Sequence, residues 1–271
     1  MKKASVILTT YNAEEWLQKV LIGYSNQTEK AFELIIADDG SSEKTKNVIE
    51  SIAKEYSLDI KHVWQEDNGF QKSKILNKAI IESSCEYLIF SDGDCIPRKD
   101  FIAQHIKNKE IGYFLSGGYY KLPLITSQKI TKKTILNNDC FKPKWLLNNG
   151  LELSFKLTKL TQNTFFGAFM NWITPTKKTF NGHNSSCYKS DILAVNGFNE
   201  EMKYGGLDRE LGERLFNYGI LAKQIRYSAI CVHLDHERSY ATKENWAHNN
   251  AIRKYNKKHQ VTHIDKGIIK K

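Results

Sequence analysis

Two carboxylates stand one residue apart in the segment SDGDC, residues 91–95, directly after the apolar run YLIF. Asp and Gly are common turn formers, so the segment by itself is compatible with an ordinary turn after a strand. Asp92 and Asp94 could instead aim carboxylate oxygens at one divalent cation, because open α/β sheets bind ligands where their strands end. The pair alone leaves the turn and the cation site open.

Two further polar segments follow apolar runs in the same way, namely TTYN at 9–12 and ADDGSS at 37–42. Since the carboxyl ends of parallel strands meet at one sheet edge, we expect both segments beside the acid pair. No glycine-rich phosphate loop follows the first run, which argues against a dinucleotide cofactor or a P-loop. Tyr11, Asp39 and the acid pair then suggest a metal-assisted nucleotide site.

Alternating strands and helices must position these residues. Apolar, β-branched runs predict strands, and apolar residues at helical spacing predict the helices between them. Asn12 is the expected N-cap of the first helix, with Glu15 three residues on. The alternation predicts an α/β fold with a Rossmann-like, mostly parallel sheet flanked by helices. The predicted strands span 4–11, 32–39, 59–67 and 86–94, and the predicted helices span 12–24, 41–56 and 72–83.

Beyond residue 112 the periodicity weakens into aromatic and lysine-rich segments that we cannot order. A helix at 207–218 and a strand at 228–234 are predicted, followed by a polar, basic tail. The sequence shows no internal repeat and no low-complexity linker.

Composition bounds the class of protein. The 271 residues suit one large domain or two small ones, and a formal net charge of +10 favours anionic partners, although general lysine richness would give the same excess. Five widely spaced cysteines without a C-x-x-C pair favour a reducing compartment. We find no signal-peptide core and no spanning run, so we expect a cytoplasmic protein, with peripheral contact to an anionic membrane surface as a further possibility. That contact would use the basic tail, including Lys257, Lys258, Lys266, Lys270 and Lys271.

The ordered series TTYN, ADDGSS and SDGDC resembles the inverting glycosyltransferases of family 2, which have the GT-A fold. GFNEEMKYGGLDRELGERL, residues 197–215, resembles a carboxyl-terminal segment of galactosyltransferase-like and chondroitin-polymerase-like enzymes. The likeness covers residues 4–106 and 181–238. It implies one continuous GT-A domain, in which 1–110 bind the nucleotide sugar and 111–271 form an acceptor-side carboxyl-terminal subregion that supplies the catalytic base.

On the donor side, the resemblance implies that Tyr11 stacks on uracil and that Asp39 accepts a hydrogen bond from the ring N–H. Thr9 would line the same pocket. Asp92 would contact ribose or metal, and Asp94 would hold the divalent cation that bridges the donor diphosphate.

The segment GFQKSKILNKAI, residues 69–80, resembles one in which a basic residue and an asparagine face the nucleotide. Lys74 and Asn77 lie three residues apart, on one helical face, and are the first choices for these roles. Lys72 is a secondary candidate. A solvated basic face explains the lysines equally well.

On the acceptor side, Asp208 aligns with the residue that relatives use as general base. Leu207 is a departure, because many relatives carry Glu there, and this leaves the type of acceptor open. Gly206 would let the backbone approach the sugar closely. Glu210 could bind acceptor hydroxyls, or could simply complement the dipole of the helix.

The segment HLDHER, residues 233–238, follows a predicted strand at whose end relatives place a metal-ligating histidine. His233 is the first choice and His236 the second. A mixed carboxylate and imidazole set suits Mn²⁺ better than Mg²⁺.

The resemblance therefore implies metal-dependent transfer of a sugar from a UDP-sugar donor to a saccharide or lipid-linked saccharide acceptor, in surface polysaccharide or lipopolysaccharide synthesis. A sugar-phosphate nucleotidyltransferase is one alternative, but it would need a glycine-rich basic loop after the first strand. A basic nucleic-acid-binding protein is another, but the lysines are dispersed and the acids converge, so we expect no nucleic acid partner. Neither the transferred sugar nor the oligomeric state follows from the sequence.

Overall fold

The computed structural model describes residues 1–236 and 242–270. Within these residues the strands are β1 Ala4–Thr10, β2 Phe32–Asp38, β3 Ile60–Trp64, β4 Tyr87–Asp92, β5 Cys95–Pro97, β6 Tyr113–Ser116, β7 Gly118–Lys121, β8 Ser185–Tyr188, β9 Leu221–Gln224 and β10 Ile230–His233. The α-helices are α1 Glu14–Ser25, α2 Glu43–Tyr56, α3 Lys72–Glu82, α4 Phe101–Asn108, α5 Leu124–Lys129, α6 Lys132–Leu136, α7 Pro143–Asn148, α8 Thr164–Ile173, α9 Lys189–Ala194, α10 Leu207–Tyr218 and α11 Lys243–Lys258. Short 3₁₀ helices span Asp139–Phe141 and Phe155–Leu160.

A seven-stranded sheet runs through the molecule in the order β3-β2-β1-β4-β8-β6-β9. Its strands are parallel except for β8, which runs antiparallel to both β4 and β6. A second sheet, β5-β10-β7, lies beside it. Because β8, β6 and β9 all come from beyond residue 110, the large sheet is continuous across the two halves expected from the sequence.

Two apolar cores cover the two faces of the large sheet. Along β1, Val6 and Leu8 enter one core and Ile7 enters the other, as the two-residue repeat of a strand requires. The first core also contains side chains of α1 and α2, whereas the second contains side chains of α3 and α10. Burial on both faces explains why β1, β2 and β4 are almost continuously apolar.

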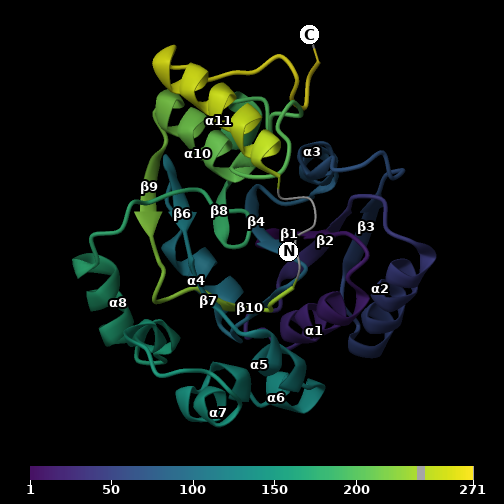
Figure 1. The fold of residues 1–271 in the computed structure, drawn as a ribbon, viewed down its shortest axis with the longest axis vertical. Coiled ribbons are helices and arrows are strands. Elements are labelled where there is room, and N and C mark those ends of the chain that lie inside the picture. The colour runs from purple at the N-terminus through teal and green to yellow at the C-terminus, as the bar shows by residue number, and fades with distance from the viewer. Residues whose placement is uncertain (237–241, 271) are drawn as a thin grey trace.

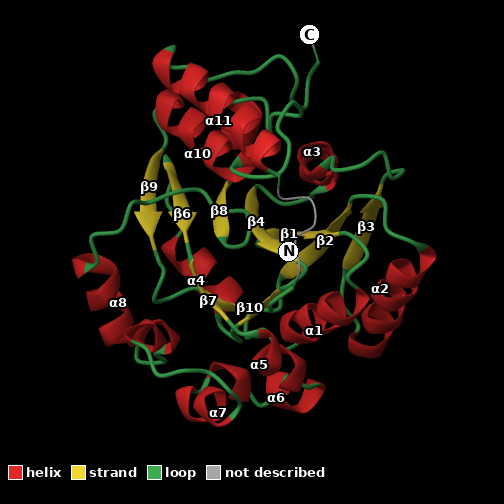
Figure 2. Cartoon of the chain, in the orientation of Figure 1, coloured by secondary structure: helices red, strands yellow, loops and turns green. Residues whose placement is uncertain are grey.

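The helices form separate groups around the sheet. Figure 1 shows α3, α10 and α11 above the strands, with α1 and α2 to the lower right, α5 to α7 along the bottom and α8 at the left. The same separation is clear when helices and strands are coloured by type (Figure 2). The small helices α5 to α8 fill the stretch that the sequence left unordered.

The predicted α/β alternation is confirmed, and so is the mostly parallel sheet. The expected cap at Asn12 is wrong, because the N-cap of α1 is Ala13. Asn12 instead has a left-handed φ of 43°, and its side-chain oxygen accepts a hydrogen bond from the Ser42 backbone N–H at 2.9 Å. Asn12 therefore links the ends of β1 and β2.

The carboxyl-terminal segment also differs from the expectation of a plain polar tail. It contains α11, whose buried residues are Asn249 and Asn256. Among the residues described, no helix combines the length and the apolar character needed to cross a bilayer. Lys271 lies outside the described residues.

Candidate active site

Asp92 is held at the sheet edge by two short contacts. It is the last residue of β4 and pairs in register with Thr9 of β1. The Thr9 hydroxyl donates to Asp92 Oδ1 at 2.6 Å, and Lys72 Nζ contacts the same oxygen at 2.7 Å. Burial acts to raise the pKa of Asp92, but the charge of Lys72 and both hydrogen bonds hold it below its usual value. Asp92 is thus a fixed, ionised carboxylate.

Asp94 faces two histidines. His236 Nε2 lies 2.7 Å from Asp94 Oδ2, and His233 Nε2 lies 3.5 Å from the same oxygen. The antiparallel pairing of β10 with β5 causes this approach, since it sets His233 opposite Cys95. Although burial opposes ionisation, these histidines hold the pKa of Asp94 well below its usual range.

The donor set around Asp94 fits a divalent cation. Two ligands at right angles around an ion with bonds of about 2.1 Å lie about 3 Å apart, close to the separations of the histidine nitrogens from Asp94 Oδ2. Cys95 Sγ is also near, at 3.2 Å from Asp94 Oδ1, but burial raises the pKa of this thiol well above its usual value. Asp94, Cys95 and His233 each offer a ligand atom within 4.8 Å of the others, and His236 approaches the same carboxylate, so these four residues form the candidate metal centre.

The turn between the two acids requires a close approach of backbones. The Gly93 N–H donates to the Thr9 carbonyl at 2.8 Å, and a Cβ at this position would lie 2.8 Å from the same oxygen. Glycine at position 93 therefore lets the turn fold back onto β1. This contact is how the sequence SDGDC aims both acids at one edge.

Asp208 sits at the start of α10, after Gly205 and Gly206. Among the described residues its Oδ1 is buried without a hydrogen-bond partner, and a Cβ on Gly182 would lie 2.6 Å from this oxygen. Burial raises the pKa of Asp208, and the negative charge of Asp92 adds to this while Lys72 opposes it. Asp208 therefore shares one electrostatic environment with Lys72 and the acid pair.

Helix α11 secures the segment that leads to Asp208. The Asn249 side-chain amide donates to the carbonyl oxygens of Lys203, Tyr204 and Gly205, at 2.8, 3.1 and 2.6 Å. These bonds fix the path of the chain just before α10 begins. A helix that the sequence pattern did not reveal thus positions the candidate base.

Tyr11 and Asp39 lie at the ends of neighbouring strands. Asp39 is almost fully buried, and its carboxylate accepts from Gln65 Nε2 at 2.6 Å and from the Gln71 N–H at 2.8 Å. Burial raises its pKa. Tyr11 is 47% exposed, and its hydroxyl donates to Asp67 at 2.8 Å. Because β1 and β2 are paired, the exposed ring and the buried acid follow adjoining strand ends.

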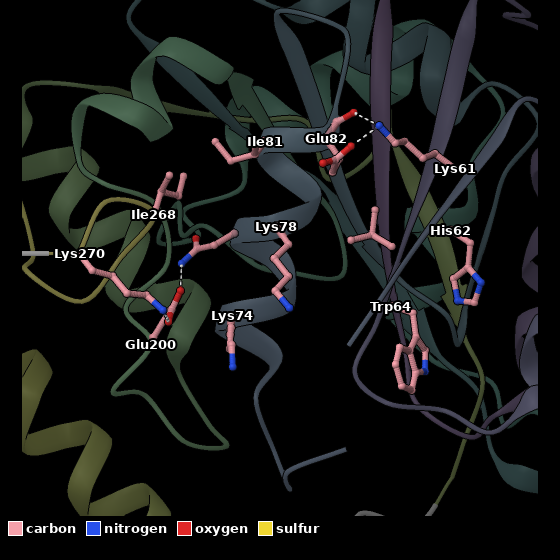
Figure 3. Close-up of a pocket in the computed structure, with 12 residues that line it drawn as sticks. Lys61, His62, Trp64, Lys74, Lys78, Ile81, Glu82, Glu200, Ile268 and Lys270 are labelled. Atoms are coloured by element: carbon pink, nitrogen blue, oxygen red, sulfur yellow. Dashed lines mark hydrogen bonds and ion pairs between the residues drawn. The ribbon is translucent and has the colours of Figure 1, made fainter. Parts of the chain in front are cut away.

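Lys74 and Asn77 are placed differently from the expectation. Both line a separate cavity of about 500 Å³ between α3, β3 and the carboxyl-terminal segment (Figure 3). Asn77 is buried, and its side chain bonds both the N–H and the carbonyl of Phe198 at 2.8 Å. Asn77 therefore anchors a loop, and Lys72, the secondary candidate, is the lysine at the acid pair.

Glu210 also differs from its expected role as an acceptor contact. Its carboxylate is fully buried and pairs with Arg214 through contacts of 2.7 and 2.9 Å. Asn256 of α11 donates to it at 2.7 Å, and Arg214 binds the carbonyl of Gly197 at 2.6 Å. The pair ties α10 to its neighbours, which leaves Glu210 a structural residue. Gly206 is the N-cap of α10, with a φ of +81°.

His183 belongs to this region but was missed from the sequence. Its ring makes an edge contact with Tyr119, at 4.3 Å between centroids, and among the described residues its Nε2 has no hydrogen-bond partner. Burial lowers its pKa to about 4, against the opposing charges of Asp92 and Asp94. The only sequence signal was a lone histidine in NGHNSS, within a stretch lacking periodicity.

The family model for glycosyl transferase family 2 matches residues 5–172, which is more than half of the chain. The chain belongs to glycosyl transferase family 2. An uncharacterized glycosyltransferase, YfnE of Bacillus subtilis (strain 168), is 27% identical over 264 residues, covering 86% of this chain and 65% of that protein. The hyaluronan synthase of Pasteurella multocida is 29% identical over 240 residues, covering 82% of this chain and 23% of the synthase. The chain thus spans two thirds or less of these relatives.

Solved structures of the family's fold superpose on most of the chain. S. aureus TarS 1–349 in complex with UDP-GlcNAc has a TM-score of 0.64 at 18% identity and covers 95% of this chain and 69% of that one. The mannosyltransferase PcManGT from Pyrobaculum calidifontis, in complex with GDP-Man and Mn²⁺, has a TM-score of 0.59 at 17% identity and covers 88% and 58%. The fold is therefore GT-A. The family favours a glycosyltransferase over the nucleotidyltransferase and nucleic-acid-binding alternatives.

Proposed function

We propose that this member of family 2 transfers a sugar from a UDP-sugar donor to a hydroxyl of a saccharide or lipid-linked saccharide acceptor, with inversion at the anomeric carbon. Surface polysaccharide or lipopolysaccharide synthesis is the proposed setting. One observation carries the proposal: Lys72, from a distant part of the sequence, contacts Asp92 at 2.7 Å, and the charges of Asp94 and Asp208 act on the same lysine. Carboxylates for a cation, a fixed positive charge and a separate buried acid are the groups that this reaction needs.

The donor side would bind the nucleotide and its diphosphate. Tyr11 offers a ring for stacking on uracil, and Asp39 offers an acceptor for the ring N–H. Asp94 with His233 and His236 would hold Mn²⁺ (or Mg²⁺), which when bound neutralises charge on the departing diphosphate. Thr9 and Lys72 keep Asp92 oriented, and Lys72 adds a positive charge of its own.

Asp208 is the proposed general base. The raised pKa makes its carboxylate a better proton acceptor, and Oδ1 is not engaged by any described donor. An acceptor hydroxyl beside Asp208 would lose its proton there as its oxygen attacks the anomeric carbon. Attack from the face opposite the departing diphosphate inverts the configuration.

The donor assignment is tested by binding and by turnover. We expect UDP to bind more tightly with Mn²⁺, and Asp94→Ala to reduce the affinity in Mn²⁺ by about tenfold or more, because a metal ligand is lost. Isothermal titration calorimetry measures the affinity, and UDP release from a panel of UDP-sugars identifies the donor. The control is Asp265→Asn, far along the chain. Unchanged metal-dependent affinity in Asp94→Ala would refute the metal centre.

The proposed membrane contact is better supported by the region around α8 than by the basic tail. Lys266 and Lys270 pair with Glu201 and Glu200, so part of the tail's charge is neutralised. By contrast, residues 153–173 expose large apolar side chains near the exposed lysines at 156, 177 and 178. Phe165 is 87% and Trp172 is 82% exposed. Aromatic residues flanked by lysines suit the interface of an anionic bilayer.

Flotation with vesicles tests this contact. We expect binding to vesicles of phosphatidylcholine with phosphatidylglycerol, and much less to phosphatidylcholine alone. Phe165→Ser with Trp172→Ser should weaken binding by about tenfold or more, since each large apolar side chain contributes about 1.5–3 kcal/mol when buried. Ile111→Ser with Ile269→Ser is the control, because both isoleucines are exposed elsewhere. Equal loss in both variants would rule out a specific role for α8.

A further inference from the structure

A second cavity, of about 570 Å³, opens between β7, the segment leading to β8, α10 and α11. Its size suits a disaccharide-sized ligand. Its lining is strongly basic, because one carboxylate, Glu213, faces seven cationic side chains. These are Lys159, Lys177, Lys178, Arg209, Arg226, Arg253 and Lys257.

Most of this positive charge is uncompensated. Arg253 forms a two-point ion pair with Glu213, at 2.6 and 3.1 Å. Within residues 1–236 and 242–270, the other six cations form no ion pair. A carboxylate or phosphate entering the cavity would therefore meet unpaired donors rather than displace existing partners.

Arg226 and Lys159 are two partly buried cations of this cavity. The Arg226 Nη2 donates to the Lys177 carbonyl at 2.9 Å, but its Nε is buried with no hydrogen-bond partner among the described residues. Burial lowers the pKa of Lys159, and the positive charge of Arg226 lowers it further. Two partly buried cations that repel each other, one with an unused donor, are stabilised when an anion binds between them.

The cavity adjoins the reaction centre on the acceptor side. Tyr119 and His183 line it. The negative charges of Asp92 and Asp94 act to raise the pKa of His183, so this histidine lies near the acid pair. Arg209 directly follows Asp208 on α10. Tyr119 and Phe216 are each about 40% exposed and offer apolar faces of the kind that sugar rings contact. Tyr119 also lies beside His233, at 6.2 Å between ring centroids, so the cavity borders the candidate metal centre as well.

We propose that this cavity binds an anionic group of the acceptor saccharide, either the carboxylate of a uronic acid or a phosphate ester. The inference rests on the proposed function, in which the donor diphosphate is already served by Lys72 and the metal centre. The proposed substrate class is an acidic glycan. Experiment distinguishes the carboxylate of a uronic acid from a phosphate ester.

Matched saccharide pairs test the inference. One pair is a glucuronate-containing tetrasaccharide and its carboxyl-reduced form, and the other is an oligosaccharide phosphate monoester and its dephosphorylated form. Calorimetry is performed on the full chain with saturating UDP and Mn²⁺. We expect the charged member of at least one pair to bind at least tenfold more tightly than its neutral counterpart. No preference in either pair would overturn the inference.

Variants then locate the binding. Lys159→Gln with Arg226→Gln should abolish the preference, and Lys178→Gln alone should reduce it. Lys44→Gln with Lys54→Gln removes the same charge from exposed positions of α2 and should leave it unchanged. UDP affinity and UDP release without acceptor should stay at the wild-type level in every variant. Equal loss of preference in the α2 variant, or loss of UDP affinity in the cavity variant, would contradict the assignment.

These readouts separate the two proposals. UDP release from a UDP-sugar without any preference for charged saccharides would overturn the acidic acceptor alone. A clear preference for charged saccharides, with no UDP-sugar turnover under any condition, would refute the glycosyltransferase proposal and its acceptor together. The thermal midpoint of each variant shows whether the protein has remained folded.

Discussion

The two sides of the candidate site handle charge in opposite ways. On the side of β4 every carboxylate has protein partners, as Asp92 has Thr9 and Lys72, and Asp94 has His236. On the side of the basic cavity, six of seven cations lack an ion-pair partner among the residues described. The first side is organised before any ligand arrives, whereas the second has charge left for a ligand to neutralise.

This difference follows from how each side is built. The acids stand at the ends of buried strands, where ladder hydrogen bonds fix the backbone before the side chains are placed. The basic cavity is assembled from turns, a short 3₁₀ helix and the faces of α10 and α11. Rigid strand ends suit a reaction centre that needs fixed geometry. Loops and helix faces suit the recognition of a variable acceptor.

The comparison depends most on Asp208, which lies between the two sides. Asp208→Asn keeps the shape but cannot take a proton, so turnover should fall by about 10²–10⁴-fold while UDP and Mn²⁺ affinities stay near wild type. Initial rates of UDP release and calorimetry measure the two effects.

Glu50→Gln, on the exposed face of α2, is the control for Asp208→Asn. If Asp208 only stabilised the helix end, the variant would lose about 1 kcal/mol of stability and keep near-normal turnover. The structure gives α10 an N-cap at Gly206 without a side-chain cap bond. A stable and active Asp208→Asn enzyme would refute the role of Asp208 as the general base.

A substitution at Glu210 tests whether this residue stabilises the fold or contacts the acceptor. Glu210→Gln leaves Arg214 buried without its counter-charge, which should cost about 3–5 kcal/mol and lower the thermal midpoint by on the order of 10 °C. Turnover per folded molecule should change little at low temperature. Scanning calorimetry with activity assays measures both.

Glu15→Gln is the matched control, because Glu15 and Lys19 have the same i,i+4 spacing as Glu210 and Arg214 but Glu15 is largely exposed. Its loss should cost less than about 1 kcal/mol. If Glu210→Gln instead kept its stability and lost turnover, Glu210 would be an acceptor residue after all.

The same contrast explains how much could be predicted from the sequence. Strands β1, β2 and β4 are apolar runs that end in polar residues, so both the fold and the convergence of Thr9, Asp92 and Asp94 were predictable. Strands β6, β7 and β8 have four residues each, too few for a period to show. His183 and the basic cavity depend on these short elements, and so they were missed.

Helix α11 was not predicted from the sequence for a different reason. Its buried residues are Asn249 and Asn256, which serve backbone carbonyls and Glu210 rather than an apolar core. Hydrophobic periodicity cannot reveal a helix that packs through polar side chains. Asn77 was misjudged similarly, because a polar residue on a helix face can bind a neighbouring loop as readily as a ligand.

Lys72 and Lys74 provide the finest test of the comparison, since they are two residues apart on α3 and differ in surroundings. Lys72 lies among Asp92, Asp208 and Asp94, whose charges raise its pKa despite its burial. Lys74 contacts Gln71 at 3.3 Å and lines the cavity of Figure 3. Lys72→Gln should lower turnover by about tenfold, within the range for a lost charged hydrogen bond, whereas Lys74→Gln should stay within about twofold of wild type.

Both substitutions remove one positive charge from the same helix, so each serves as the control for the other. A general effect of net charge on binding of an anionic donor would lower both rates alike. A larger effect at Lys74 would move the nucleotide to the cavity beside β3 and away from the acid pair. A loss confined to Lys72→Gln would place the positive charge that turnover needs at the acid pair, where Lys72 contacts Asp92.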